Sequence, residues 1–151
     1  KLIFIRHAYA PGGGDPNNFD INDCNTQRNL SDSGREQANK IGSFFKSNNI
    51  LINKVHSSEW CRCKETALIA FNEFETKSFL NSFFSSKFSQ NKDLQMKQLN
   101  RFIKNWDGKK NLVFITHYVV IYESLNYASS SGEIIISDKG LKVIDTIEIE
   151  Y

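Results

Sequence analysis

The sequence predicts an α/β protein in which helices cover both faces of a mostly parallel sheet. Short apolar runs rich in β-branched and aromatic residues alternate with stretches whose apolar residues recur at helical spacing. This alternation is typical of parallel strands joined by helices. The chain has 151 residues, which is the length of about one domain, and we see no internal repeat or linker. We therefore expect a three-layer α/β/α sandwich made by a single domain over residues 1–151.

Local patterns predict each element in chain order. Ser31 is a good N-cap for the first helix, whose buried face would hold Ala38 and Ile41. Residues 11–29 are rich in Gly, Asp and Asn and predict a long loop, which inside a compact domain is usually functional. Residues 78–90 are aromatic and rich in Ser, without a clean period. The predicted strands cover residues 2–5, 53–56, 112–115, 132–136 and 141–149. The first predicted helix begins at residue 31, and three further helices cover about residues 59–72, 92–105 and 119–127.

Charge and hydropathy exclude several classes of partner. The formal net charge is +2, which argues against a protein that wraps a nucleic acid. No stretch reaches the roughly 18 apolar residues of a membrane-spanning helix.

Lys1 already opens the first predicted strand, so a leader removed from the native chain stays an open alternative.

The three cysteines leave two interpretations open. Cys61 and Cys63 lack the two-residue spacer of a zinc knuckle or a redox pair. All three thiols are free in the first interpretation, which fits a cytoplasmic protein. In the second, Cys24 pairs with Cys61 or Cys63 and pins the long loop to the rim of the site, which fits an oxidising compartment such as a periplasm.

Basic residues mark the ends of three predicted strands. Arg6 and His7 follow the first strand, Arg62 lies shortly beyond the second, and His117 follows the third. Ligands of open α/β sheets bind outside the carboxyl ends of the strands. A neutral imidazole can attack phosphorus, and a guanidinium can hold two phosphate oxygens. The pattern predicts a pocket for a dianion such as phosphate or sulfate.

Several longer segments accompany these residues and occur in a characteristic order. They are Arg6-His7-Ala8, the helix start Leu30-Ser31-x-x-Gly34-x-x-Gln37-Ala38, Ser57-Ser58 through Arg62 to Glu65-Thr66-Ala67, and Thr116-His117. With them the chain resembles the histidine phosphatase superfamily, which also contains the cofactor-dependent phosphoglycerate mutases. It is most similar to the small single-domain branch.

The resemblance implies a phosphoglycerate mutase-like fold and a metal-independent phosphatase. His7 would be the nucleophile that becomes phosphohistidine, while Arg6, Arg62 and His117 would bind the non-bridging oxygens. The substrate would be a phosphorylated small molecule or a phosphoprotein. No cofactor is implied, and no cluster of residues has the spacing of metal ligands. A silent phosphate-binding or scaffold protein and a phosphomutase are the alternatives.

The general acid has no assigned residue. Asn81 and Ser82 stand where many members of the family carry a carboxylate, and Tyr118 follows the second histidine where another branch has Asp. Asp15 and Asp20 on the long loop are the candidates within this chain. A third option is that the enzyme uses no acid, because a phosphorus–nitrogen ester or an acyl phosphate has an easier leaving group.

Further residues are candidates for binding the substrate. Gln27 and Arg28 could reach over the pocket, with ordinary turn chemistry as the alternative, and Tyr118 and Gly13 would also contact substrate. The Gly12–Gly14 run would supply a carbonyl that fixes the tautomer of His7. The remaining polar residues have structural readings: His56 lies within a strand, Ser57 and Ser58 cap the next helix, and Glu65 supports the pocket wall.

Overall fold

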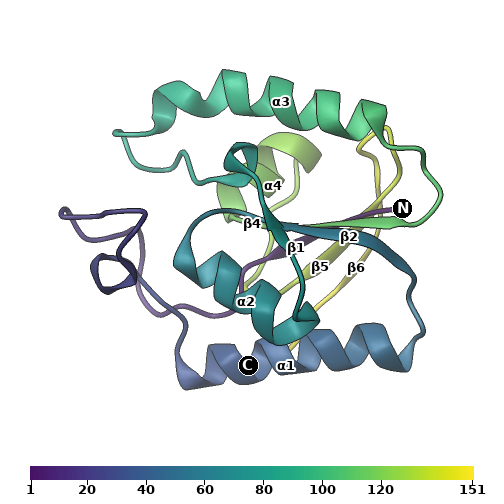
Figure 1. Cartoon of the computed structure of the whole chain (residues 1–151), viewed down its shortest axis with the longest axis horizontal. Helices are drawn as coiled ribbons and strands as arrows, with labels where there is room; N and C mark the ends of the chain where they lie inside the picture. The colour runs from purple at the N-terminus through teal and green to yellow at the C-terminus, as the bar shows by residue number, and fades with distance from the viewer.

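The computed structural model describes residues 1–151 and places one six-stranded sheet between two layers of helices (Figure 1). The strands are β1 (Leu2–Arg6), β2 (Ile52–Ser57), β3 (Glu75–Thr76), β4 (Asn111–Thr116), β5 (Ile134–Ser137) and β6 (Val143–Ile147). The helices are α1 (Asp32–Ser47), α2 (Cys61–Phe71), α3 (Lys92–Asn105) and α4 (Tyr118–Leu125), with 3-10 turns at Cys24–Thr26, Ser78–Leu80 and Ser89–Asn91.

The sheet is mostly parallel, as the sequence predicts. Its strand order is β3-β2-β4-β1-β5-β6, and the first four strands run parallel to one another. The last two strands form an antiparallel hairpin, and β5 also pairs antiparallel with β1. Parallel strands need helical crossovers whereas a hairpin needs only a short turn, which accounts for the helix-poor C-terminal end.

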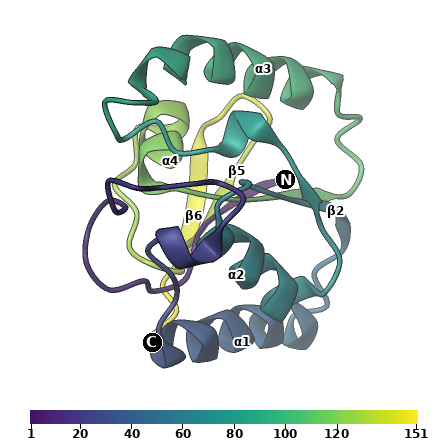
Figure 2. The same ribbon diagram turned by 60° about the vertical axis from the view of Figure 1, so that its left-hand side comes forward.

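Each face of the sheet has its own core, because successive residues of a strand point to opposite faces. Leu2 and Phe4 of β1 pack with residues of α3 and α4, whereas Ile3 and Ile5 pack with residues of α1 and α2. Figures 1 and 2 both show α1 and α2 below the sheet and α3 and α4 above it. The predicted α/β/α sandwich is therefore confirmed. None of the four helices combines the length and the apolar character that crossing a membrane requires.

The start of α1 anchors this helix to the chain beyond β1. Ser31 is the N-cap, and its hydroxyl accepts a hydrogen bond from the Gly34 N–H at 3.1 Å. A Cβ atom at Gly34 would lie only 2.0 Å from the carbonyl oxygen of Tyr9. Glycine is required here because the helix approaches the backbone behind the nucleophile candidate so closely.

The segment between α2 and α3 contains no long helix or strand, in agreement with the lack of a clean period in residues 78–90. It contains the short edge strand β3 and two 3-10 turns, and it follows the face of the sheet that α3 covers. The hydroxyl of Thr116 donates to the Leu80 carbonyl at 2.6 Å, and the Gln95 amide donates to the Asn81 carbonyl at 2.8 Å. These side-chain hydrogen bonds hold the segment on the sheet and on α3.

Candidate active site

The register of the parallel strands brings the two histidines together. Arg6 is paired with Thr116 across β1 and β4, and each of these residues is followed by a histidine. The His7 N–H donates to the Thr116 carbonyl at 3.0 Å, and the His7 and His117 rings lie 5.5 Å apart, edge to face. Parallel pairing places both carboxyl ends at the same edge, so residues far apart in sequence become neighbours.

Arg62 completes the centre from the first turn of α2. Its Nε donates to Nε2 of His7 at 3.1 Å, so Nε2 carries a lone pair rather than a proton. The proton of this ring then lies on Nδ1, which donates to the Ala8 carbonyl at 2.8 Å. The prediction that the Gly12–Gly14 run supplies this carbonyl is therefore wrong. The carbonyl of Ala8, the residue that follows His7, takes this role.

Both rings are neutral at neutral pH. Burial lowers the pKa of His7 well below its usual 6.5, and the Arg62 charge lowers it further. Burial and Arg62 likewise lower the pKa of His117 well below 6.5. A ring that stays unprotonated keeps the lone pair that attack on phosphorus needs.

Four cationic side chains line a cavity of about 380 Å³ beside the two histidines: Arg6, Arg28, Arg62 and Lys87. Two polar atoms of this centre, Nε of Arg6 and Nδ1 of His117, are buried without a hydrogen-bond partner in the protein. Buried polar atoms in native proteins are nearly always satisfied, so an unsatisfied one in a cavity wall calls for an explanation such as a catalytic role or a bound ion. The charge and the unpaired Arg6 donor both suit a tetrahedral anion.

Asp15 is held as the partner of Arg62. Its Oδ1 accepts from Nη1 of Arg62 at 2.9 Å and from the Arg28 N–H at 3.0 Å, and its Oδ2 accepts from Nε1 of Trp60 at 3.1 Å. The carboxylate is only 17% exposed. Asp15 thus fixes the direction of the Arg62 guanidinium. The other candidate acid, Asp20, does not line the cavity, and its carboxylate accepts from the Asn22 N–H.

Of the two loop residues expected over the pocket, the structure places one in the cavity wall. Arg28 lines the cavity, and its guanidinium donates to the backbone carbonyls of Gly14 and Ala10. Gln27 does not line the cavity. Its amide is buried, donating to the Asp20 carbonyl and accepting from the Cys61 N–H at 2.9 Å. Gln27 therefore joins the loop to the start of α2.

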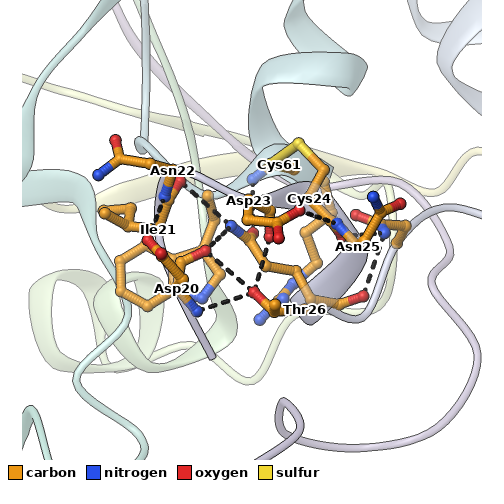
Figure 3. The surroundings of a disulfide bond; sticks show 12 residues. Asp20, Ile21, Asn22, Asp23, Cys24, Asn25, Thr26 and Cys61 are labelled. Atoms are coloured by element: carbon orange, nitrogen blue, oxygen red, sulfur yellow. Dashed lines mark hydrogen bonds between the residues drawn. A yellow bond between two sulfur atoms is a disulfide. The ribbon is translucent and has the colours of Figure 1, made fainter. Parts of the chain in front are cut away.

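A disulfide between Cys24 and Cys61 reinforces this junction (Figure 3). Figure 3 shows Cys24 among the hydrogen-bonded residues of the loop turn, where the Thr26 hydroxyl donates to the Asp23 carbonyl at 2.7 Å. Cys63 is a buried free thiol, and burial raises its pKa to about 12. Of the two pairings that the sequence leaves open, the structure contains the one with Cys61.

Gly13 and Tyr118 lie in the cavity wall as expected. The Arg6 guanidinium lies 5.4 Å from the centre of the Tyr118 ring, and its Nη1 donates to the Ser129 carbonyl at 2.6 Å. These two contacts hold Arg6 from different parts of the chain. Glu65 does not line the cavity and instead pairs with Arg35 on α1 at 2.6 Å.

Sequence reasoning missed the residues that orient His117. The hydroxyl of Ser58 lies 2.8 Å from Nε2 of His117, and it also accepts from the Trp60 N–H and donates to the Asn81 amide oxygen. The predicted capping of α2 by Ser57 and Ser58 is wrong, because Trp60 is the N-cap of this helix and its side chain makes no capping hydrogen bond. The Ser57 hydroxyl donates to the Ser58 carbonyl instead. Residues of the segment 82–88 also supply part of the cavity wall, and their only signal in the sequence is their aromatic and Ser-rich composition.

His56 lies outside the cavity, as its place within a strand suggests. Its ring packs against Phe102 and Phe114, with centres 4.9 and 5.9 Å away, and its Nδ1 is 4.0 Å from a carboxylate oxygen of Glu75. Burial, with the charge of Lys77, lowers its pKa from 6.5 to about 4.

This shift predicts acid sensitivity. Between pH 6.5 and pH 4 the unfolded chain binds a proton at His56 that the folded chain does not bind, so the free energy of unfolding decreases as the pH falls. The His56→Phe variant should lose about 2 to 3 kcal/mol less than the wild type between about pH 7.5 and pH 4.5. Urea unfolding at both pH values measures this difference. Equal pH dependence of the two proteins would contradict the assignment.

Comparisons with known proteins agree with this geometry. The family model of the histidine phosphatase superfamily (branch 1) matches residues 2–82. A search among curated proteins finds no match.

Solved structures share the fold over nearly the whole chain. The protein histidine phosphatase SixA complexed with tungstate has a TM-score of 0.67 and 14% identity, over 99% of this chain and 96% of that one. The phosphoglycerate mutase of Thermus thermophilus has a TM-score of 0.68 and 16% identity, over 99% of both chains. The product of an open reading frame of Mycobacterium tuberculosis reaches a TM-score of 0.64 at 15% identity, over 99% of this chain and 96% of that one.

Proposed function

Because the chain belongs to the histidine phosphatase superfamily, we propose that it is a metal-independent phosphatase. It hydrolyses a phosphomonoester or a phosphorylated side chain through a phosphohistidine at His7. The observation that carries the proposal is the unprotonated Nε2 of His7, which accepts a hydrogen bond from Arg62 in a cavity that Arg6 and Arg28 also line.

The reaction takes place in two displacements. Nε2 of His7 attacks phosphorus, the bond from phosphorus to the leaving oxygen breaks, and the electron pair departs with that oxygen. Water then attacks the phosphohistidine and breaks the phosphorus–nitrogen bond, which releases phosphate and restores the ring. Nδ1 keeps its proton, which it donates in a hydrogen bond to the Ala8 carbonyl, and it shares the positive charge that the ring gains.

The arginines stabilise the charge on the phosphoryl group. In the free enzyme Arg62 donates to the nitrogen that attacks, and a bound phosphoryl group would take over this donor. Arg6 contributes the unpaired Nε, and His117, which follows β4, lines the same cavity with its ring 5.5 Å from that of His7. Asp15 and the Ser129 carbonyl fix the two guanidiniums before substrate arrives, so little reorganisation is needed during the reaction.

The contacts of Asp15 support a positioning role rather than that of general acid, because both of its oxygens already accept hydrogen bonds. Asp15 is the only carboxylate in the cavity wall. This supports the option in which the leaving group departs without a proton from a protein carboxylate.

The disulfide supports an oxidising compartment such as a periplasm as the place of action. Thiol pools of the cytosol keep most cysteine pairs reduced. Cys61 lies between Trp60 and Arg62, which both line the cavity, so the compartment would also determine how tightly the loop is held there.

The deciding experiment combines turnover with trapping of the intermediate. We expect the protein to hydrolyse p-nitrophenyl phosphate at an unchanged rate in the presence of a metal chelator. Rapid quenching in alkali should yield a phosphoenzyme that is stable in base, labile in acid and located on the peptide that contains His7. Absence of turnover on a panel of phosphoesters would favour a phosphate-binding protein, and a phosphoryl group on another residue would overturn the mechanism.

A further inference from the structure

Aromatic side chains line the cavity alongside its cations. Phe19, Trp60 and Phe88 form a packed cluster, with ring centres 4.8 to 5.7 Å apart. The Trp60 ring also contacts the His117 ring, edge to face, at 5.4 Å. Aromatic side chains therefore lie beside His117 and in the wall of the same cavity.

Phe84 is a further aromatic residue of the cavity wall. It lines the cavity, yet it is 69% exposed and stacks on no other ring of the protein. Its segment is tied to the first loop, because Nζ of Lys87 donates to the Asn17 carbonyl at 2.8 Å. When a ligand covers a large apolar side chain in the wall of a cavity, apolar surface is removed from water, and this stabilises the complex.

The lining of the cavity restricts the leaving group. No carboxylate with a free oxygen lines the wall, so the leaving group must depart without help from a carboxylic acid. A phenol, with a pKa near about 10, departs far more easily than an alkanol, whose pKa is close to the roughly 15.7 of water.

We infer that the substrate is the phosphate ester of a phenol, whose ring lies against Phe84 and the cluster of Phe19, Trp60 and Phe88. This inference rests on the proposed phosphatase function. Two sources share this chemistry, namely a free aryl phosphate and a phosphotyrosyl side chain. The ring supplies apolar and edge-to-face contacts, while the phosphoryl group binds the arginines.

The Phe84→Ala variant tests the contact with the ring. It should raise the KM for phenyl phosphate about threefold to tenfold and leave the KM for glycerol phosphate unchanged. Leu51→Ala is the matched control, because Leu51 is also 69% exposed but lies away from the cavity. A phosphotyrosyl peptide measured beside phenyl phosphate identifies the source, since a protein substrate should have the lower KM of the two. Equal effects on aryl and alkyl esters, or preferred turnover of a phosphoimidazole, would overturn the inference.

A binding experiment separates this inference from the proposed function. Phenylphosphonate cannot be hydrolysed, so its affinity reports the ring contact even if the protein has no turnover. Calorimetry should show that phenylphosphonate binds the wild type about threefold to tenfold more tightly than methylphosphonate does, and that Phe84→Ala removes the difference. Turnover that depends on His7, together with equal affinities for the two phosphonates, would refute the aromatic subsite and leave the phosphatase intact.

Discussion

Replacing His7 by alanine is expected to lower turnover of any phosphoester by at least about 10⁴-fold, because the variant has no nitrogen to accept the phosphoryl group. The rest of the centre should survive. Arg62 keeps its ion pair with Asp15, and Arg6 keeps the Ser129 carbonyl, so the anion-binding charges stay in place. The measurement is kcat/KM with p-nitrophenyl phosphate.

Binding of inorganic phosphate provides the control that His7→Ala needs. The variant should still be stabilised against heat by phosphate, because the guanidiniums rather than the imidazole carry the charge. His56→Phe, which changes another buried histidine, should keep the turnover of the wild type. Substantial turnover by a folded, phosphate-binding His7→Ala variant would show that the nucleophile lies elsewhere.

Removing the Cys24–Cys61 disulfide is expected to lower the free energy of unfolding by about 4 kcal/mol, the chain-entropy value for a closed loop of this length. The bridge spans a sequence separation of 37 residues, which includes α1 and β2. Urea unfolding of the Cys24→Ala/Cys61→Ala double variant measures the loss, and reductant should produce the same shift in the wild type.

The catalytic effect of losing the disulfide should be smaller than its effect on stability. The Asp15–Arg62 ion pair and the Gln27–Cys61 hydrogen bond still join the loop to α2. Cys63→Ala is the matched control, and it should respond to reductant as the wild type does, because its thiol is free and buried. Identical unfolding of the wild type with and without reductant would show that Cys24 and Cys61 are not bonded in the folded protein.

The site residues that the sequence could identify lie directly after predicted strands or in the first turn of the helix that follows one. Arg6, His7 and His117 follow apolar runs, and Arg62 lies in the first turn of the helix that follows another such run. Because parallel strands end at a common edge, three strand ends in the sequence suffice to predict that these side chains converge. The three-layer fold follows from the same alternation.

The sequence could not predict which polar residues line the cavity and which form hydrogen bonds within the protein. Gln27 and Arg28 are adjacent and equally polar, yet one is buried against α2 and the other lines the cavity. Asp15 meets Arg62 across 47 residues, and Ser58 meets His117 across 59. Such pairs depend on how the loops are placed on the sheet, and no local period records this placement.

The cysteines show most clearly what the sequence determines and what the tertiary structure determines. The sequence by itself established that a bridge from Cys24 would end at one of two residues of a single helix. Residues two apart on a helix do not share a face, and only the packing of α2 decides which of them is turned toward the loop. Cys63 is buried in the core against the sheet, which leaves Cys61 beside the loop within bonding distance of Cys24.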